Sequence, residues 1–289
     1  MDQVNVSILK CVGLKDRDVE ILRYLVENRF ATMNALEGRF WNGQAHRNHY
    51  RKLSELRAKG FIEPLIGDGG ARLGYRPTKR AIYHLKRAGF KPARITDLRS
   101  SFRTGFDHDK TVLELRNIFE KSPLVSHFLP EHQVREMLAR QYGYRDAEGN
   151  GYKVPDAMFQ LKTAKREFRV ALELELTLKS RPRYVRLLKQ LSLSRDWDVV
   201  FVIGTDRKIT SKLAIILESI RGKDVELKVS KQQHGFYFAP LSEFLERKLE
   251  CPFEGEGKKF TLTSLADEVE MTEEKNSDER IRQTETTNN

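Results

Sequence analysis

Residues 167–177 alternate between large apolar and other side chains with a period of two. This period is typical of a β-strand, because successive side chains point to opposite faces. Glu173 and Glu175 fall on one face of the predicted strand, one pleat repeat or about 6.6 to 7 Å apart. Two carboxylates at this spacing can border one site.

A second strand is predicted just upstream, over residues 154–161. Pro155 lies at its start, where a strand tolerates proline, and Asp156 follows directly. If the two strands form a hairpin, Asp156 lies beside Glu173. The hairpin would therefore gather carboxylates from two strands.

Carboxylates from paired strands suit a divalent metal. Mg²⁺ binds proteins through one or two carboxylates and keeps water and substrate phosphate in its other positions. Such an ion polarises a scissile phosphate and activates water, while a nearby amine shares the developing negative charge. Lys179, four residues after Glu175, is the nearest candidate for the amine. We predict a Mg²⁺ or Mn²⁺ site formed by Asp156, Glu173 and Glu175.

The same residues admit a purely structural interpretation. Glutamates that alternate with leucines also occur on an edge strand with one face in water, which would explain Glu173 and Glu175 without any chemistry. Lys179 could merely extend its aliphatic stem over apolar surface. Both interpretations remain open from the sequence.

Segments around the two strands predict a mixed α/β core. Residues 110–120 and 183–193 have helical periodicity, and residues 198–204 form an apolar run that is typical of a strand buried on both faces. Together with the two strands, these segments give the order helix, strand, strand, helix, strand.

The amino-terminal part predicts a smaller module of helices and a hairpin. Helices are expected over residues 15–28, 33–40 and 44–59, with Thr32 capping the second and Gly60 ending the third. Residues 61–76 predict two strands around a glycine-rich turn. This order resembles a winged helix.

The third helix carries the basic residues of this module. Its apolar side is expected to hold Tyr50, Leu53, Leu56 and Ala58. In a winged helix the third helix enters the major groove and the hairpin lies along the DNA backbone. A solvated face of a protein-interaction domain is the alternative. The residues expected to contact DNA are Arg47, Asn48, Arg51, Lys52, Arg72 and Arg76.

Composition agrees with a nucleic-acid partner. The net charge is +11, and charged residues of both signs make up 32% of the chain, so the excess should form patches. Cys11 and Cys251 have no metal-binding or disulfide spacing, which fits a reducing compartment. Without a signal sequence or an apolar span of about 20 residues, a cytoplasmic protein with no membrane insertion is expected.

The carboxylates also resemble a known family. Pro155-Asp156 followed by Glu173-Leu174-Glu175 is similar to the PD-(D/E)xK motif of restriction-type nucleases. Glu175 stands where the motif has lysine, so either a variant motif with glutamate applies or Lys179 has taken the lysine's role. The resemblance implies a restriction-endonuclease-like mixed-sheet core with flanking helices, in the order helix, strand, strand, strand, helix, strand.

A winged helix followed by such a core resembles the plasmid replication-relaxation group and its MobC-class relaxases. The resemblance implies that Asp156, Glu173 and Glu175 are metal and catalytic carboxylates, with Lys179 and His108 nearby; helix capping by His108 is the alternative. The expected domains are a winged helix at residues 1–95, a catalytic α/β domain at 96–253 and an acidic, disordered tail at 254–289.

The resulting hypothesis is a metal-dependent DNA relaxase that nicks a specific origin-like site, with other transfer or replication proteins as further partners. Tyr142, Tyr144 and Tyr184 are expected to pack in the protein and not to bind DNA covalently. One rival is a non-catalytic DNA-binding replication or regulatory protein on a decayed nuclease fold. Another is a transposition or defence nuclease that makes double-strand breaks.

Overall fold

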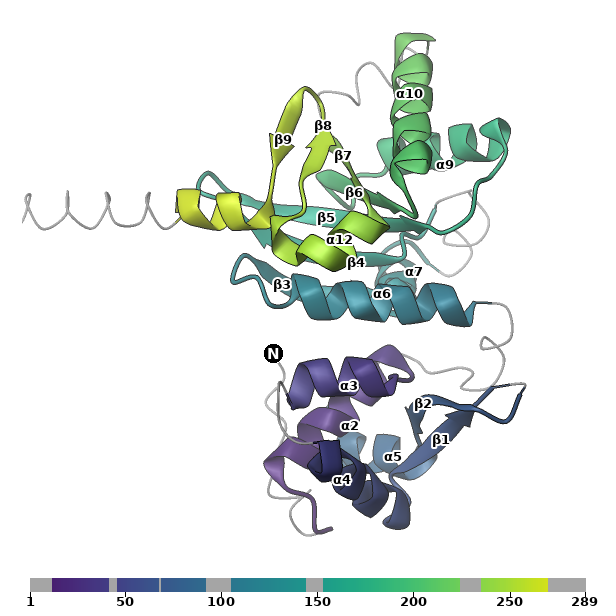
Figure 1. Ribbon diagram of the computed structural model, residues 1–289, viewed down its shortest axis with the longest axis vertical. Helices are drawn as coiled ribbons and strands as arrows, with labels where there is room; N and C mark the ends of the chain where they lie inside the picture. Colours follow the sequence, from purple (N-terminus) through teal and green to yellow (C-terminus); the bar gives the residue numbers. More distant parts are fainter. Residues whose placement is uncertain are drawn as a thin grey trace, which may run out of the picture. The chain divides into compact units, whose positions relative to one another are not determined.

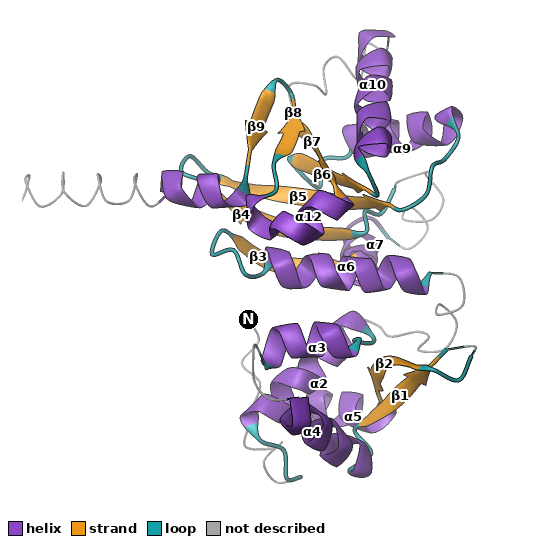
Figure 2. Cartoon of the chain, viewed as in Figure 1, coloured by secondary structure: helices purple, strands orange, loops and turns teal. Residues whose placement is uncertain are grey.

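The computed structural model describes residues 12–41, 46–67, 69–91, 105–143, 153–223 and 235–269. The chain forms two compact units, Met1–Asn117 and Ile118–Asn289, which can be followed along the sequence colours of Figure 1. The domain boundary predicted between residues 95 and 96 lies outside the described residues. Helices and strands occur together (Figure 2), so the chain is a mixed α/β protein, as predicted. Within the described ranges, every helix is too short or too polar to traverse a lipid bilayer.

The first unit contains helices and a two-stranded hairpin in the predicted order. Thr32 and Thr78 cap two of the helices, because their hydroxyl oxygens accept hydrogen bonds from the backbone N–H of Ala35 (3.2 Å) and Ala81 (3.3 Å). Apolar side chains from the helices and the hairpin share one buried core. The elements are α2 (Asp16–Asn28), α3 (Met33–Phe40), α4 (His46–Ala58), β1 (Ile62–Ile66), β2 (Arg72–Pro77), α5 (Lys79–Arg87) and α6 (Phe106–Phe119), whose last two residues belong to the second unit.

Gly74 lets the hairpin pack against the segment between α2 and α3. Ala31 and Tyr75 exchange two backbone hydrogen bonds of 2.9 Å. A Cβ atom at residue 74 would lie 2.2 Å from the carbonyl oxygen of Ala31, so only glycine allows this approach. The contact fixes the position of the hairpin on the helices.

The buried side of α4 differs from the predicted one. Leu53 and Leu56 are buried, as expected, but Tyr50 is 47% exposed and Ala58 is also exposed, and His49 is buried instead. The His49 ring stacks on Trp41 with 4.7 Å between centroids, and its Nδ1 atom lies 3.3 Å from Glu37. An aromatic partner and a carboxylate therefore allow a polar ring to occupy the core side of the helix.

The second unit is built around a mixed sheet, which has seven strands among the described residues. The order is β3-β4-β5-β6-β7-β8-β9, with β5, β6 and β7 parallel to one another and the other neighbours antiparallel. The strands are β3 (Val125–Pro130), β4 (Ala157–Lys162), β5 (Glu167–Glu175), β6 (Val199–Gly204), β7 (Gly235–Pro240), β8 (Phe253–Gly255) and β9 (Lys258–Phe260).

Both faces of this sheet are buried. On one face, Val134, Tyr184 and Leu213 from three different helices pack against the strands. On the other face, Phe119 and Phe244 pack against aromatic side chains of the strands, including Phe159, Phe201 and Phe253. The helices of this unit are α7 (Glu131–Tyr142), α9 (Arg181–Leu193), α10 (Arg207–Lys223) and α12 (Leu241–Arg247), and η1 (Lys248–Glu250) is a 3₁₀ helix.

The interior position of β5 overturns the edge-strand interpretation of its glutamates. β5 is hydrogen bonded to β4 on one side and to β6 on the other. Glu173 and Glu175 are only 3% and 2% exposed. Water therefore does not explain the polar alternation of this strand. A further difference from the predicted order is α7, which lies in sequence between β3 and β4.

Residues 254–269 correct the prediction of a tail from residue 254. They contribute to β8 and β9, and residues 262–269 are helical. Phe253 is fully buried and stacks on Phe201 with 4.3 Å between centroids, and Leu262 and Val269 are also buried. Acidic composition suggested disorder, but a few well-placed apolar residues suffice to anchor the segment. Residues 270–289 lie outside the described residues.

Candidate metal centre and nucleic-acid interface

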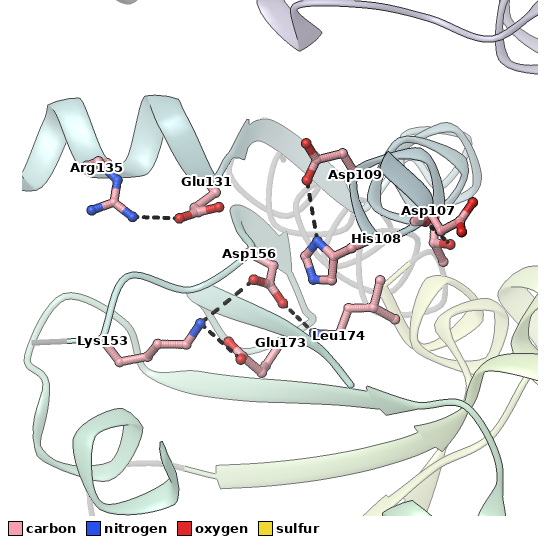
Figure 3. A network of polar contacts seen from close by, with 10 residues as sticks. Asp107, His108, Asp109, Glu131, Arg135, Lys153, Asp156, Glu173 and Leu174 are labelled. Atoms are coloured by element: carbon pink, nitrogen blue, oxygen red, sulfur yellow. Dashed lines mark hydrogen bonds and ion pairs between the residues drawn. The ribbon is translucent and has the colours of Figure 1, made fainter. Parts of the chain in front are cut away.

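The register of β4 and β5 positions two carboxylates. Ala157 pairs with Leu172, so the next residues outward, Asp156 and Glu173, are neighbours across the two strands. Asp156 is buried, and its Oδ2 atom accepts a hydrogen bond of 2.7 Å from the backbone N–H of Leu174. This bond fixes the Asp156 carboxylate over β5, as Figure 3 shows.

Lys153 joins these two carboxylates, and the sequence analysis missed it. Its Nζ atom lies 3.0 Å from Oε1 of Glu173 and 3.7 Å from Oδ1 of Asp156. Figure 3 shows the ammonium group between the two acids. Burial lowers the pKa of Lys153, but the charges of Glu173 and Asp156 outweigh it and raise the pKa, so Lys153 remains protonated. The only sequence feature that could have indicated this role is the position of Lys153, three residues before Asp156.

Glu173 is held in an environment that disfavours its charge. Burial, and then the nearby charge of Asp156, raise the pKa of Glu173 to about 8, although Lys153 opposes the shift. Its Oε2 atom is buried and has no hydrogen-bond partner among the described residues. A second cation, in addition to Lys153, would stabilise the ionised form of this carboxylate.

Glu175 forms a separate ion pair at the end of β5. Its Oε1 atom lies 2.7 Å from Nζ of Lys179, whereas its Oε2 atom is buried and has no hydrogen-bond partner within the described ranges. Burial raises the pKa of Glu175 despite this pairing. Lys179 thus lies next to the third carboxylate, and Lys153 lies next to the first two.

Tyr184 holds the turn that carries Lys179. Its hydroxyl group accepts a hydrogen bond of 2.9 Å from the backbone N–H of Lys179 and donates one of 3.2 Å to the carbonyl oxygen of Thr177. Tyr184 is fully buried. Tyr142 donates a hydrogen bond of 2.6 Å to Asp196, and Tyr144 lies outside the described residues. Tyr184 therefore packs in the protein as predicted, whereas Tyr142 is 42% exposed, which corrects the prediction that it packs inside.

The side chains around β5 have the donor chemistry that a hard divalent cation prefers. Asp156, Glu173 and Glu175 provide carboxylate oxygens, two of which are buried without a hydrogen-bond donor in the part of the chain that the structure describes. Three acidic groups face two lysines, so full ionisation leaves one net negative charge. Within the described ranges, however, no three His, Cys, Asp or Glu side chains are grouped closely enough to hold a metal ion by themselves. Water and a substrate phosphate would have to complete the coordination.

His108 lies on α6, in the first unit. Its Nδ1 atom is 3.4 Å from a carboxylate oxygen of Asp109, the next residue along the helix. The three carboxylates belong to the second unit, so a role for His108 beside them stays a prediction.

The first unit has a hollow of about 340 Å³ beside α4. Asn48 and Arg51, both predicted to contact DNA, are exposed along it. Lys15 and Arg17, at the start of α2, line the same hollow and extend its positive charge. They were not predicted, because the sequence alone does not bring the start of α2 next to α4. The Arg47 side chain lies outside what the structure describes.

Three other cations predicted to contact DNA are paired within the protein. Lys52 lies 2.8 Å from the buried carboxylate of Asp18. Arg76 donates a hydrogen bond of 2.7 Å to Glu63. Arg72 donates one of 3.1 Å to the hydroxyl group of Tyr75. These side chains therefore have structural roles whether or not they also contact a ligand.

The geometry defines a mixed α/β protein with three buried carboxylates beside two partly exposed lysines in one unit and a basic hollow in the other. Comparison with protein-family models, with curated proteins and with solved structures found no match to this chain.

Proposed function

We propose that this chain is a divalent-metal-dependent DNA endonuclease of the relaxase type. The observation that carries the proposal is the convergence of the buried Asp156 and Glu173 on one lysine, where β4 begins and β5 ends. A buried acidic pair costs folding free energy, so its presence in an interior strand favours a role in chemistry over a role in stability.

In this proposal Asp156 and Glu173 hold Mg²⁺ or Mn²⁺, and Glu175 borders the same site. The ion would polarise the scissile phosphate and lower the pKa of an attacking hydroxyl group. The PD-(D/E)xK motif has a lysine where this chain has Glu175. In this proposal Lys153 supplies that amine, because it already contacts the first two carboxylates. Lys179 opposes the rise in the pKa of Glu175 and so favours its ionised form. Tyr184 positions Lys179 through the backbone.

The first unit would bind the DNA as a winged helix. Its exposed residues Asn48 and Arg51 would reach the bases or the backbone, and Lys15 and Arg17 would contact phosphates. The net charge of +11 supports a polyanionic partner. The sequence resemblance to MobC-class relaxases makes a plasmid origin the proposed target, in the cytoplasm and together with other transfer or replication proteins.

A plasmid-nicking assay tests this function. Supercoiled plasmid that carries the origin from the same replicon is incubated with the full chain and Mg²⁺, and nicked circles are expected. The Asp156→Asn variant keeps an oxygen that accepts the Leu174 hydrogen bond but removes the charge, so it should fold and fail to nick. Equal activity of Asp156→Asn and the unaltered chain would contradict the proposal. Linear product would instead indicate a double-strand nuclease.

A non-catalytic DNA-binding protein is the second candidate, and the two lysines favour it. Lys153 and Lys179 already compensate most of the acidic charge, as in a structural ion-pair network. Titration calorimetry with Mn²⁺ distinguishes the two functions. A catalytic site should bind the metal and lose binding in the Glu173→Gln variant, whereas a structural network should give no binding in either protein.

A further inference from the structure

A groove of about 780 Å³ lies at the opposite end of the sheet from the carboxylates. It forms where β5, β6 and β7 begin, and helical residues 262–269 border it. Phe168 lines the groove five residues before Glu173, about 16 Å away along β5. An odd spacing also directs the two side chains to opposite faces of the sheet. The groove is thus separate from the candidate metal centre.

Three half-buried aromatic rings line the groove: Phe168, Tyr237 and Phe260. Tyr237 and Phe260 meet edge to face with 4.8 Å between their centroids. The guanidinium group of Arg166 lies 4.2 Å from the centroid of Phe168. Partly covered aromatic rings and guanidinium planes are surfaces on which unstacked bases pack.

Gly235 provides the space that the Tyr237 ring occupies. A Cβ atom at residue 235 would lie 2.9 Å from the Tyr237 ring, closer than real Cβ contacts. A larger residue at the start of β7 would therefore displace the ring from the groove. Because glycine has no side chain, residue 235 leaves room for the Tyr237 ring to line the groove.

Basic side chains surround these rings. The lining cations are Lys165, Arg166, Lys258 and Lys259. Lys259 pairs with Glu254 at 2.6 Å, whereas Lys165 and Lys258 are exposed and have no ionic partner among the described residues. Cations that border aromatic rings in this way can hold phosphates while the rings hold bases.

The groove also contains two carboxylates, but the positive charges outnumber them. Asp198 accepts a hydrogen bond of 2.8 Å from the backbone N–H of Arg169, and the Arg169 guanidinium lies 3.4 Å from the same oxygen. The charge of Asp198 is therefore compensated by a residue outside the lining. Glu268, on the helical residues 262–269, is the other acid.

We propose that this groove binds a segment of single-stranded nucleic acid. The bases pack against Phe168, Tyr237 and Phe260, and the phosphates lie near Lys165 and Lys258. A duplex keeps its bases stacked on each other, so it does not present their faces to protein rings. The inference does not depend on catalysis at Asp156, because the groove shares no residue with the carboxylate cluster.

Fluorescence anisotropy with labelled oligothymidine and the full chain tests the groove. The Lys165→Ala/Lys258→Ala variant should lower affinity at least about tenfold and reduce the slope of log affinity against log salt by about 1.4, since each lost single-strand phosphate contact removes about 0.7. Phe168→Leu should lower affinity about tenfold and leave the slope unchanged, because base stacking releases no counter-ion.

Lys121→Ala is the matched control, since Lys121 is exposed in the same unit but lies outside the groove. It should stay within about twofold of the unaltered chain, as expected for a charge without a phosphate contact. Thermal unfolding establishes that Phe168→Leu is folded. Unchanged affinity in the double lysine variant, or an equal loss in Lys121→Ala, would overturn the proposal. The Asp156→Asn variant should bind oligothymidine as the unaltered chain does but fail to nick plasmid. The groove proposal and the nicking proposal are thus tested separately.

Discussion

Nζ of Lys153 lies 3.0 Å from Oε1 of Glu173 and 3.7 Å from Oδ1 of Asp156, so one ammonium group serves two buried carboxylates. Two buried carboxylates side by side are unfavourable without positive charge nearby. A divalent metal at these oxygens would add to or replace the charge of Lys153. The metal-free and metal-bound proteins should therefore differ most in how Lys153 is held.

Replacing Lys153 by methionine should destabilise the metal-free protein by about 2 kcal/mol, less than a fully buried pair, because the lysine remains partly in water. Mg²⁺ should restore more stability to this variant than to the unaltered chain, since it then supplies the missing positive charge. Urea unfolding with and without Mg²⁺ measures both effects. Lys121→Met, at an exposed lysine, should change stability by less than about 0.5 kcal/mol. Equal Mg²⁺ stabilisation of the Lys153 variant and the unaltered chain would contradict this prediction.

Metal affinity should rise with pH because Glu173 must lose its proton to bind a cation. With the pKa of Glu173 raised to about 8, the fraction of ionised carboxylate grows up to about fiftyfold between about pH 6 and about pH 8, and the apparent affinity for Mn²⁺ grows with it. Calorimetric titration across this range gives the profile. An affinity that is flat over the range would show that Glu173 is not a ligand or that its pKa is normal.

Tyr184→Phe should weaken the Lys179 turn without abolishing nicking. Loss of the two hydrogen bonds of the hydroxyl group should cost about 1 kcal/mol of stability. Activity should fall about tenfold, since displacement of a positioned cation by a small distance has effects of this order or larger. A denaturing gel for protein joined to DNA gives the decisive control. A covalent adduct that disappears in Tyr184→Phe would identify this tyrosine as a nucleophile instead.

Arg51→Ala and Lys52→Ala should affect the first unit in different ways. Arg51 is exposed, so its loss should lower DNA affinity and reduce the salt slope by about 0.9, with little change in stability. Lys52 neutralises the buried carboxylate of Asp18, so its loss should destabilise the unit by about 1 to 3 kcal/mol. DNA-binding titrations at several salt concentrations and thermal unfolding separate the effects. Similar results for both variants would remove the distinction.

The sequence predicts the individual helices and strands of this chain better than it predicts which strands lie next to each other in the sheet. The alternation in β5 and the apolar run of β6 are local patterns, and both strands form as expected. The neighbours of β5 depend on which strands approach from elsewhere in the chain. For this reason the edge-strand interpretation of Glu173 and Glu175 could not be rejected without the structure.

In the candidate site too, contacts between segments close in sequence could be predicted and the others could not. Asp156 and Glu173 become neighbours through a hairpin between strands only a few residues apart, so their proximity could be predicted. Lys153 could not be placed, because it precedes the strand and its long side chain must fold back between the two acids. Lys179, chosen for its proximity in sequence, pairs with Glu175 alone among the described ion pairs.

The position of a bound Mn²⁺ ion tests the central hypothesis most directly. Crystals of the full chain soaked in Mn²⁺ should show an anomalous peak at coordination distance from both Asp156 and Glu173, with the Lys153 ammonium displaced from one of these carboxylates. The same experiment on Asp156→Asn should show no peak. If a soak at a concentration that supports nicking leaves Lys153 bridging the two acids and no peak between them, these carboxylates are not the metal site.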